Sequence, residues 1–252
     1  MGKVYLVGAG PGAADLLTVR ATRLLARADV VFHDALVEQD VLDLAPGATL
    51  IAVGKRCGAH STSQRFINKR LVDAAARHAT VVRLKGGDPM LFGRAQEEID
   101  ALVAAGIDVE VVPGVTAALA AASDLRLSLT RRGVARSVTL VTPRAGEGES
   151  PHAWTRAAAG ADTAVIYMGA GQAEAIAEAL IAEGRSPVTP VVLVENAGRD
   201  GESHCAGVLR DLPSLAASRG TGPAVILLGE IARPLAEQAT AQQPFSLQRA
   251  AG

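Results

Sequence analysis

The chain has 252 residues, of which 49% are hydrophobic and 20% charged, so it can bury a sizeable core. Aromatic residues make up only 3%, and the core must therefore consist mainly of alanine, valine and leucine. The formal net charge of −1 argues against a general nucleic-acid-binding protein, which needs an excess of lysine and arginine. This length suits two modest α/β domains or one large one.

The cysteines and histidines give no sign of a metal site or of a disulfide framework. Cys57 and Cys205 are the only cysteines, and they lie far apart without metal-ligand spacing, as do the five histidines. No run of 18 apolar residues predicts a membrane span, and the N-terminal residues lack a signal-peptide pattern. We therefore expect a cytoplasmic protein without a bound metal, a membrane partner or a nucleic-acid partner.

In the first half of the chain, apolar runs that read as strands alternate with helical patterns. The predicted strands are 3–7, 29–32, 49–53, 80–82 and 109–112. The predicted helices are 15–26, 63–77, 94–105 and one that Thr116 can cap. The helix over 63–77 is rich in basic residues, for which a solvated face is the simple explanation.

The second half repeats this alternation. Its predicted strands are 137–141, 163–167, 190–195, an edge strand at 204–209 and a buried strand at 224–228, with a helix over 172–183. Such alternation predicts mostly parallel sheets. We place an N-terminal α/β domain at 1–112, a C-terminal α/β domain at 113–236, and a disordered or loosely docked tail at 237–252, which has no sustained apolar face.

The stretch from Arg83 to Arg94 is the most informative part of the sequence. A strand stops there on Gly86 and Gly87, whose backbones can take conformations closed to other residues and let a ligand approach the main chain. Pro89 removes an amide donor and biases the preceding residue away from helix. A strand that ends in a glycine turn before a helix is where open α/β sheets bind ligands.

A second glycine-rich turn, Gly8–Gly12, follows the first predicted strand. Its spacing fits a dinucleotide-binding fingerprint with Ala13 in the third glycine position, and Asp34 follows just over twenty residues later. Pro11 weakens this interpretation because it deletes an amide donor from the phosphate-binding turn. An NAD-dependent dehydrogenase therefore stays open as an alternative.

Several turns and charged side chains follow predicted strands and could serve one ligand. Besides the two glycine turns, these are Thr116–Ala117 and Met168–Gly171, which suit a ligand held by main-chain hydrogen bonds. Asp34 and Lys55 could exchange protons with a substrate, although a capping aspartate and a surface lysine would look the same. Arginines near the loops would suit a substrate with many carboxylates.

At these residues the chain resembles the tetrapyrrole (corrin and porphyrin) methylases. Val7–Gly12 with Leu16-Leu17-Thr18 resembles their first signature, and Arg83–Arg94 resembles their second. Gly54-Lys55-Arg56, with Gln64 and Ile67-Asn68, narrows the resemblance to the uroporphyrinogen-III C-methyltransferase group, which includes the methylase part of siroheme synthase. The similarity runs from about Lys3 to Ile231.

The resemblance implies two α/β domains with S-adenosylmethionine in a cleft between them, a homodimer, no metal, and S-adenosylhomocysteine as product. It implies two methyl transfers onto uroporphyrinogen III, giving precorrin-2 for siroheme or cobalamin. Asp34 would be the proton acceptor and Lys55 the proton donor. The implied cofactor-binding residues are Pro11, Gly86, Gly87, Asp88, Leu91, Thr116, Ala117, Met168 and Ala197.

Three departures from the family pattern concern the substrate more than the fold. Arg132 and Pro143-Arg144 stand where the family usually has histidine-bearing motifs, and Ala197 replaces a glycine. We expect the substrate's carboxylates to bind arginines, and the candidates are Arg56, Arg94, Arg131 and Arg144. A methylase for a later precorrin, and a non-catalytic protein that binds cofactor or tetrapyrrole, stay open as alternatives.

Overall fold

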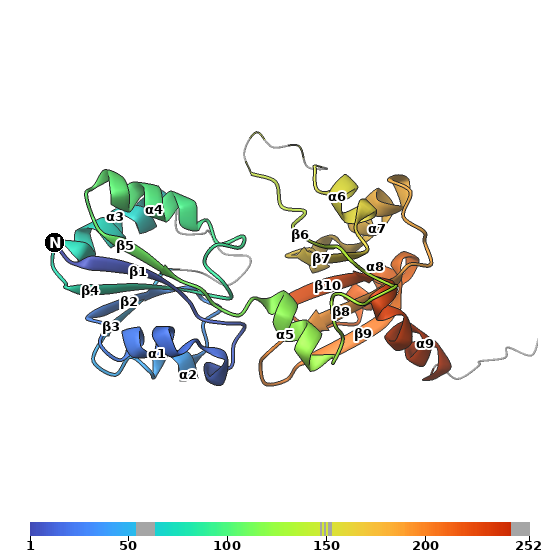
Figure 1. Ribbon diagram of the computed structural model, residues 1–252, viewed down its shortest axis with the longest axis horizontal. Helices are drawn as coiled ribbons and strands as arrows, with labels where there is room; N and C mark the ends of the chain where they lie inside the picture. The colour runs from blue at the N-terminus through green and yellow to red at the C-terminus, as the bar shows by residue number, and fades with distance from the viewer. Residues whose placement is uncertain (54–63, 147, 149, 151–152, 243–252) are drawn as a thin grey trace, which may run out of the picture. The chain divides into compact units, whose positions relative to one another are not determined.

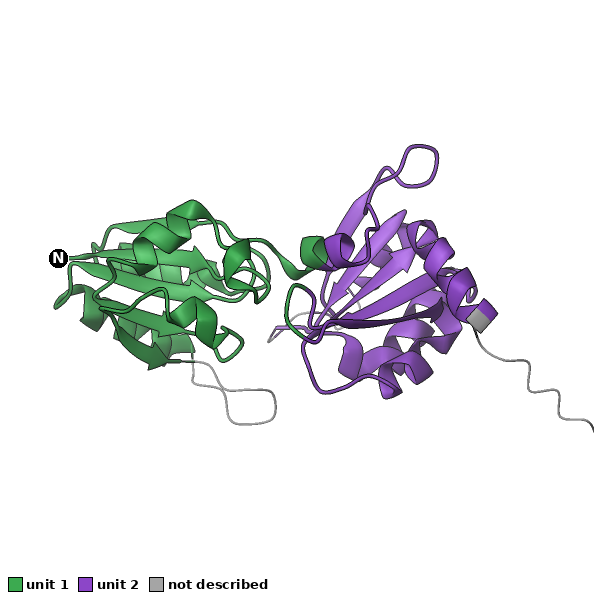
Figure 2. Ribbon diagram, turned by 90° about the horizontal axis from the view of Figure 1, so that it is seen from below, with its two compact units in different colours: residues 1–120, 198–200 green, residues 121–197, 201–252 purple. Residues whose placement is uncertain are grey.

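The computed structural model describes residues 1–53, 64–146, 148, 150 and 153–242. The chain divides into two compact units, coloured separately in Figure 2. Unit 1 is Met1–Ala120 with Gly198–Asp200, and unit 2 is Ala121–Ala197 with Gly201–Gly252. The division falls inside a helix that begins after the boundary we placed near Pro113.

Unit 1 alternates strands with helices, as the apolar runs predict. Its strands are β1 (Lys3–Gly8), β2 (Val30–His33), β3 (Thr49–Ala52), β4 (Thr80–Lys85) and β5 (Val109–Val112). Its helices are α1 (Val19–Leu25), α2 (Gln39–Leu42), α3 (Gln64–Ala75) and α4 (Ala95–Ala104), and α5 (Ala117–Asp124) starts in this unit. A short 3₁₀ helix, Ala14–Leu16, precedes α1.

The five strands of unit 1 form one parallel sheet in the order β3-β2-β4-β1-β5. Helices α3 and α4 cover one face and α1 and α2 the other (Figure 1). Side chains alternate between the two cores, so Val4 and Val81 pack under α3 and α4 while Val7 and Val82 pack under α1 and α2. The parallel sheet predicted for the first half is thus confirmed, and helices cover both of its faces.

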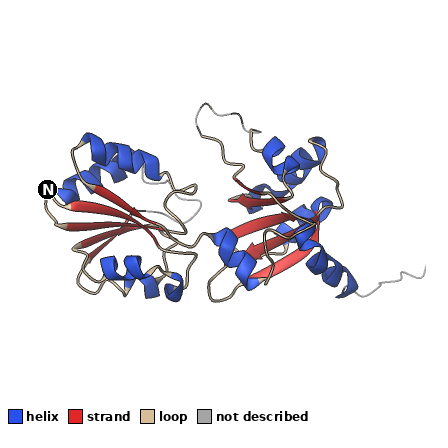
Figure 3. Cartoon of the chain, viewed as in Figure 1, coloured by secondary structure: helices blue, strands red, loops and turns tan. Residues whose placement is uncertain are grey.

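Unit 2 contains a second sheet in the order β6-β7-β10-β8-β9, drawn in red in Figure 3. Its strands are β6 (Val138–Val141), β7 (Thr163–Tyr167), β8 (Pro190–Glu195), β9 (Ser203–Val208) and β10 (Ala224–Gly229). Its helices are α6 (Thr155–Gly160), α7 (Ala173–Ala182), α8 (Leu212–Ala217) and α9 (Arg233–Gln242), with 3₁₀ turns at Ala170–Gln172, Leu209–Asp211 and Glu230–Ala232.

The strand directions in the second sheet correct one expectation. Only β6 and β7 run parallel, whereas β10 is antiparallel to β7 and β8, and β9 is antiparallel to β8. The α/β class is confirmed for both units, but mostly parallel pairing holds for the first sheet alone. Consecutive strands β8 and β9 need only the loop 196–202 to pair antiparallel. Strand β10 lies between β7 and β8, which run in the same direction, and it is antiparallel to both.

The predicted tail also needs correction, because α9 continues through Gln242. Ala232 and Ala236 are buried and Leu235 and Ala239 are partly buried, which gives this helix an apolar stripe at helical spacing. The helix packs against β8 and β9. Residues 237–242 are therefore ordered helix, and the rest of the predicted tail lies outside the described residues.

Candidate functional site

The carboxyl ends of β1, β4 and β5 bring three loops of unit 1 together. Gly10 and Gly87 form an isolated antiparallel bridge, in which the Gly87 amide donates to the Gly10 carbonyl at 2.7 Å and the Gly10 amide donates back at 3.2 Å. Both glycines have φ 69°, a conformation that side chains rarely tolerate. The two glycine-rich turns of the sequence are thus joined main chain to main chain.

A third loop packs against this junction through glycine alone. A Cβ added to Gly8 would lie 2.6 Å from Gly114 Cα, and one added to Gly114 would lie 2.3 Å from the Gly87 carbonyl oxygen. Gly86 differs, because it is exposed and the nearest atom to an added Cβ is 3.8 Å away. The loops are therefore tightly stacked, while the main chain at Gly86 is left open to a ligand.

Asp88 ties two of these loops together with its carboxylate. Its Oδ2 accepts from the Gly114 amide at 2.9 Å, and its Oδ1 accepts from the Met90 amide at 2.8 Å. Beyond it the backbone takes two left-handed turns at non-glycine residues, Phe92 with φ 52° and Arg94 with φ 55°. Such conformations are uncommon outside glycine and concentrate at functional sites.

Pro11 is held by a side chain from far along the chain. The Arg199 guanidinium donates to the Pro11 carbonyl at 2.8 Å and to the Leu36 carbonyl at 2.6 Å, and it pairs with Glu38. The Ala13 amide donates to the Gly198 carbonyl at 2.8 Å. Residues 198–200 thereby fasten the glycine loop after β1 to the segment that follows Asp34.

Asp34, the predicted proton acceptor, follows β2 and is held by Arg83 of β4. Arg83 Nη2 donates to Asp34 Oδ1 at 2.5 Å, and the Asp34 side chain is 32% exposed whereas that of Arg83 is only 3% exposed. The same guanidinium donates to the Leu84 carbonyl at 3.1 Å. One carboxylate oxygen of Asp34 is therefore bound, and the side chain still reaches solvent.

Behind Arg83 lies a buried group of charges that the sequence analysis missed. Glu98 of α4 is fully buried and accepts from Arg83 Nε at 3.0 Å and from Lys85 Nζ at 3.0 Å. Gln64 Nε2, at the start of α3, donates to Glu98 at 3.1 Å and to Asn68 at 3.0 Å. Strand alternation explains the cluster, because Arg83 and Lys85 point to the face that α3 and α4 cover.

Burial and neighbouring charges shift the pKa values of Lys85 and Arg83 in opposite directions. Burial lowers the pKa of Lys85, and repulsion from Arg83 adds to this, so that Glu98 does not restore the usual value. Burial would also lower the pKa of Arg83, but the carboxylates of Asp34 and Glu98 outweigh it and raise that pKa. Arg83 therefore stays a cation beside Asp34.

The other predicted residues of unit 1 lie on the same loops. Leu91 follows Asp88, and its amide donates to the Asp88 carbonyl at 3.3 Å. The Thr116 carbonyl starts the hydrogen bonding of α5, whose first residue is Ala117. Arg94, a predicted substrate ligand, forms a two-pronged pair with Glu97 at 2.7 and 2.8 Å and is 59% exposed.

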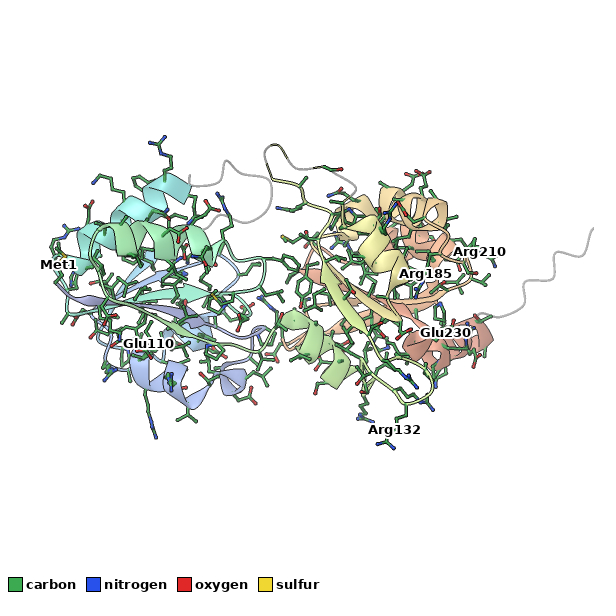
Figure 4. The ribbon with its side chains drawn as sticks, turned by 45° about the horizontal axis from the view of Figure 1, so that its top comes forward. Met1, Glu110, Arg132, Arg185, Arg210 and Glu230 are labelled. Atoms are coloured by element: carbon green, nitrogen blue, oxygen red, sulfur yellow. The ribbon has the colours of Figure 1, made fainter. Side chains whose placement is uncertain are left out.

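The remaining predicted residues of the described chain belong to unit 2. Met168 is 39% exposed with φ 55°, and Ala197 is 7% exposed. Arg131 begins a tight turn and pairs with Ala135 at its end. Arg144 comes three residues after β6, so one exposed arginine precedes this strand in the chain and the other follows it. In Figure 4, Arg132 of the same turn projects outward from unit 2.

Lys55 and Arg56 lie outside the described residues, as does Cys57. Across residues 1–53, 64–146 and 153–242, no three histidine, cysteine or acidic residues gather as a metal would require. In the same part of the chain, none of the helices has the length and apolar character to cross a membrane.

Comparison with known proteins decides the family. The model of the Tetrapyrrole (Corrin/Porphyrin) Methylases matches residues 3–213. The chain belongs to this tetrapyrrole methylase family. The resemblance seen in the two glycine-rich signatures is thus confirmed.

Individual tetrapyrrole methylases match over nearly the whole chain. A uroporphyrinogen-III C-methyltransferase of Pseudomonas aeruginosa is 44% identical over 241 residues, which are 94% of this chain and 97% of that protein. Siroheme synthase 1 of Klebsiella pneumoniae is 46% identical over 231 residues, which are 91% of this chain but only 49% of that protein. The chain thus spans about half the length of such siroheme synthases.

A solved tetrapyrrole methylase has the same fold. The uroporphyrin-III C-methyl transferase of Thermus thermophilus, in complex with S-adenyl homocysteine, is 42% identical with a TM-score of 0.82. The match covers 92% of this chain and all of that one. The two α/β units described above are therefore those of a methylase of this family.

Proposed function

We propose that the chain catalyses S-adenosylmethionine-dependent C-methylation of uroporphyrinogen III at two pyrrole carbons, giving precorrin-1 and then precorrin-2 for siroheme or cobalamin synthesis. The observation that carries the proposal is the 44% identity to the Pseudomonas aeruginosa uroporphyrinogen-III C-methyltransferase over almost the full length of both proteins. The solved relative with S-adenyl homocysteine supports the choice of cofactor.

The loops at the carboxyl edge of the first sheet fit this cofactor. Gly86 offers an exposed main chain, since the nearest atom to an added Cβ is 3.8 Å away, and the Gly10–Gly87 bridge fixes the loops around it. When bound, the cofactor supplies an activated methyl group on a sulfonium. In our proposal the residues that hold it in unit 1 are Pro11, Gly86, Gly87, Asp88, Leu91, Thr116 and Ala117, and Met168 and Ala197 are assigned the same role in unit 2.

The protein's own part in the chemistry is alignment and proton transfer. Methylation of a pyrrole carbon leaves a proton to be removed or relocated, and a carboxylate held in place near the ring can accept it. We assign this role to Asp34, whose side chain is fixed by Arg83 and partly exposed. Lys55 would donate a proton, and Arg56, Arg94, Arg131 and Arg144 would bind the acetate and propionate groups.

The experiment that tests the function is an anaerobic incubation with S-adenosylmethionine and enzymatically made uroporphyrinogen III, followed by mass spectrometry. Two added methyl groups per macrocycle are expected. A reaction without S-adenosylmethionine is the control, and absence of methylation by a protein that binds S-adenosylhomocysteine would contradict the substrate and point to a later precorrin. The proposal also includes a homodimer in the cytoplasm, which sedimentation and fractionation would test.

A further inference from the structure

The buried charges behind Asp34 need an explanation beyond stability. Arg83 and Lys85 are 3% exposed and Glu98 is not exposed at all, and each charge removed from water loses several kcal/mol of hydration. Well-packed apolar residues commonly replace buried ion pairs without loss of stability. A cluster of this kind is therefore weak evidence for stability and calls for a role in function.

The ion pairs of the cluster form a chain that leads from the buried Glu98 to one partly exposed carboxylate, that of Asp34. Glu98 binds both Arg83 and Lys85, Arg83 binds Asp34, and among these four side chains only Asp34 reaches solvent to a substantial extent, with 32% exposed. The guanidinium is held on all sides, by Glu98 at Nε, by the Leu84 carbonyl at Nη1 and by Asp34 at Nη2. It has no freedom to follow Asp34 if that side chain moves.

We infer that Glu98 is a positioning residue for the reaction: it fixes Arg83, which in turn fixes the carboxylate of Asp34 for proton transfer. This inference rests on the proposed role of Asp34 as proton acceptor. Lys85 and Gln64 complete the device, because their bonds to the two oxygens of Glu98 prevent that carboxylate from rotating. The planar guanidinium suits the task, since its fork of donors binds several acceptors in fixed directions.

The test is a double-mutant cycle between Glu98→Gln and Asp34→Asn, read as kcat, KM and the Kd of S-adenosylhomocysteine. Glu98→Gln keeps the shape of the side chain but loses the charge that holds Arg83. We expect kcat to fall by about 10- to 100-fold through misplacement of Asp34, with the Kd of S-adenosylhomocysteine changed by no more than about threefold. In the Asp34→Asn background the same change should lower kcat no further, because residues that act as a unit are not additive.

A purely structural role gives the opposite result. If Glu98→Gln lowers kcat by the same factor with and without Asp34, or leaves kcat of the wild-type background unchanged, the inference fails. Asp100→Asn makes the same chemical change on the exposed side of α4 and is the matched control. Arg83→Lys gives a second route should Glu98→Gln not fold, because one ammonium cannot serve Glu98, the Leu84 carbonyl and Asp34 together, and the same pattern is expected.

Different results would contradict the proposed function and the positioning role of Glu98. If the wild-type protein makes no methylated product, or if Asp34→Asn alone retains full kcat, the proposed function or its proton acceptor is wrong and Glu98 cannot act through it. If Asp34→Asn lowers kcat while Glu98→Gln and Arg83→Lys do not, the proposed function stands and the positioning role of Glu98 is wrong.

Discussion

Position 8 must be glycine because the surrounding main chain leaves no room for a Cβ atom, and not because its own backbone conformation demands glycine. A methyl group there would lie 2.6 Å from the Gly114 main chain and 2.7 Å from the Gly87 carbonyl oxygen, and rigid backbone cannot yield to it. Gly8→Ala should destabilise the protein by about 2 kcal/mol or more and weaken S-adenosylhomocysteine binding, measured by urea unfolding and calorimetry. Gly47→Ala is the control, because nothing lies within 4 Å of its added Cβ, and equal effects of the two changes would contradict the prediction.

Lys85 should leave a signature in the dependence of stability on pH. Its pKa is lowered below 10.5 in the folded protein, so between the lowered pKa and 10.5 the unfolded chain binds more protons. The buried ammonium of Lys85 therefore lowers the free energy of unfolding at neutral pH, and this loss of stability shrinks as pH rises through that window. Urea unfolding at about pH 8 and about pH 10 should show the wild type gaining stability relative to Lys85→Met.

The exposed Lys69, which pairs with Asp73, supplies the comparison. Lys69→Met removes an exposed lysine in the same way and serves as the control for the loss of one positive charge. A constant difference between Lys85→Met and the wild type at the two pH values would contradict the prediction.

Arg131 and Arg144 are the residues at which substrate recognition would differ from the usual family pattern. Both are exposed, as groups that bind the carboxylates of a large ligand must be in the free protein. Replacing both with alanine should raise the KM for uroporphyrinogen III by about 10-fold or more while leaving kcat nearly unchanged. An unchanged KM would remove these two arginines from the site, and Arg156→Ala on α6 provides a matched loss of an exposed arginine.

At this scale the sequence reveals site residues only where a local pattern marks them. The two glycine signatures identify loops that the structure joins, and Asp34 follows a strand end as expected. No local sequence pattern identifies Glu98 or Arg199, because a glutamate in a helix and an arginine in a loop are common in any protein. Their partners are set by strand alternation and by chain contacts across more than 160 residues, which no window of sequence contains.

Among elements, the strands are the most predictable. Runs such as Val109–Val112, Thr163–Tyr167 and Pro190–Glu195 coincide with their strands because β-branched residues cluster there. The predicted helix over 15–26 divides into a 3₁₀ turn and α1 because Thr18 leaves the helix and caps the next one, accepting from the Ala21 amide. Strand direction was predictable only in the first sheet, since apolar runs carry no information on whether a later strand inserts antiparallel.

Helix α9 gives a direct test of the corrected tail. Ala236 is 5% exposed under this helix, whereas Ala241 lies on its exposed side. Ala236→Glu should destabilise the protein by about 2 to 4 kcal/mol because it buries an unpaired charge, while Ala241→Glu should be nearly neutral. Thermal unfolding of both variants compares them, and equal midpoints would mean that α9 is not docked in solution.

For the whole molecule, ligand binding distinguishes the methylase from the dehydrogenase that the glycine fingerprint left open. S-adenosylhomocysteine at about 100 times its Kd should stabilise the native protein by about 2.7 kcal/mol, seen as a higher unfolding midpoint. NADH at the same concentration should leave the midpoint unchanged. A shift with NADH and none with S-adenosylhomocysteine would contradict the proposed cofactor.

The three residues Gly198–Asp200 have a consequence for how this chain can be divided. They belong to unit 1 although 77 residues of unit 2 precede them, and Arg199 there binds the loop that carries Pro11. A gene fragment that ends at codon 120 would encode five strands of a sheet but not the side chain that fastens its first glycine loop. A chimera of two related genes joined at that point would likewise take Glu38 from one parent and Arg199 from the other. Chimeras that take both residues from the same parent should therefore fold more stably.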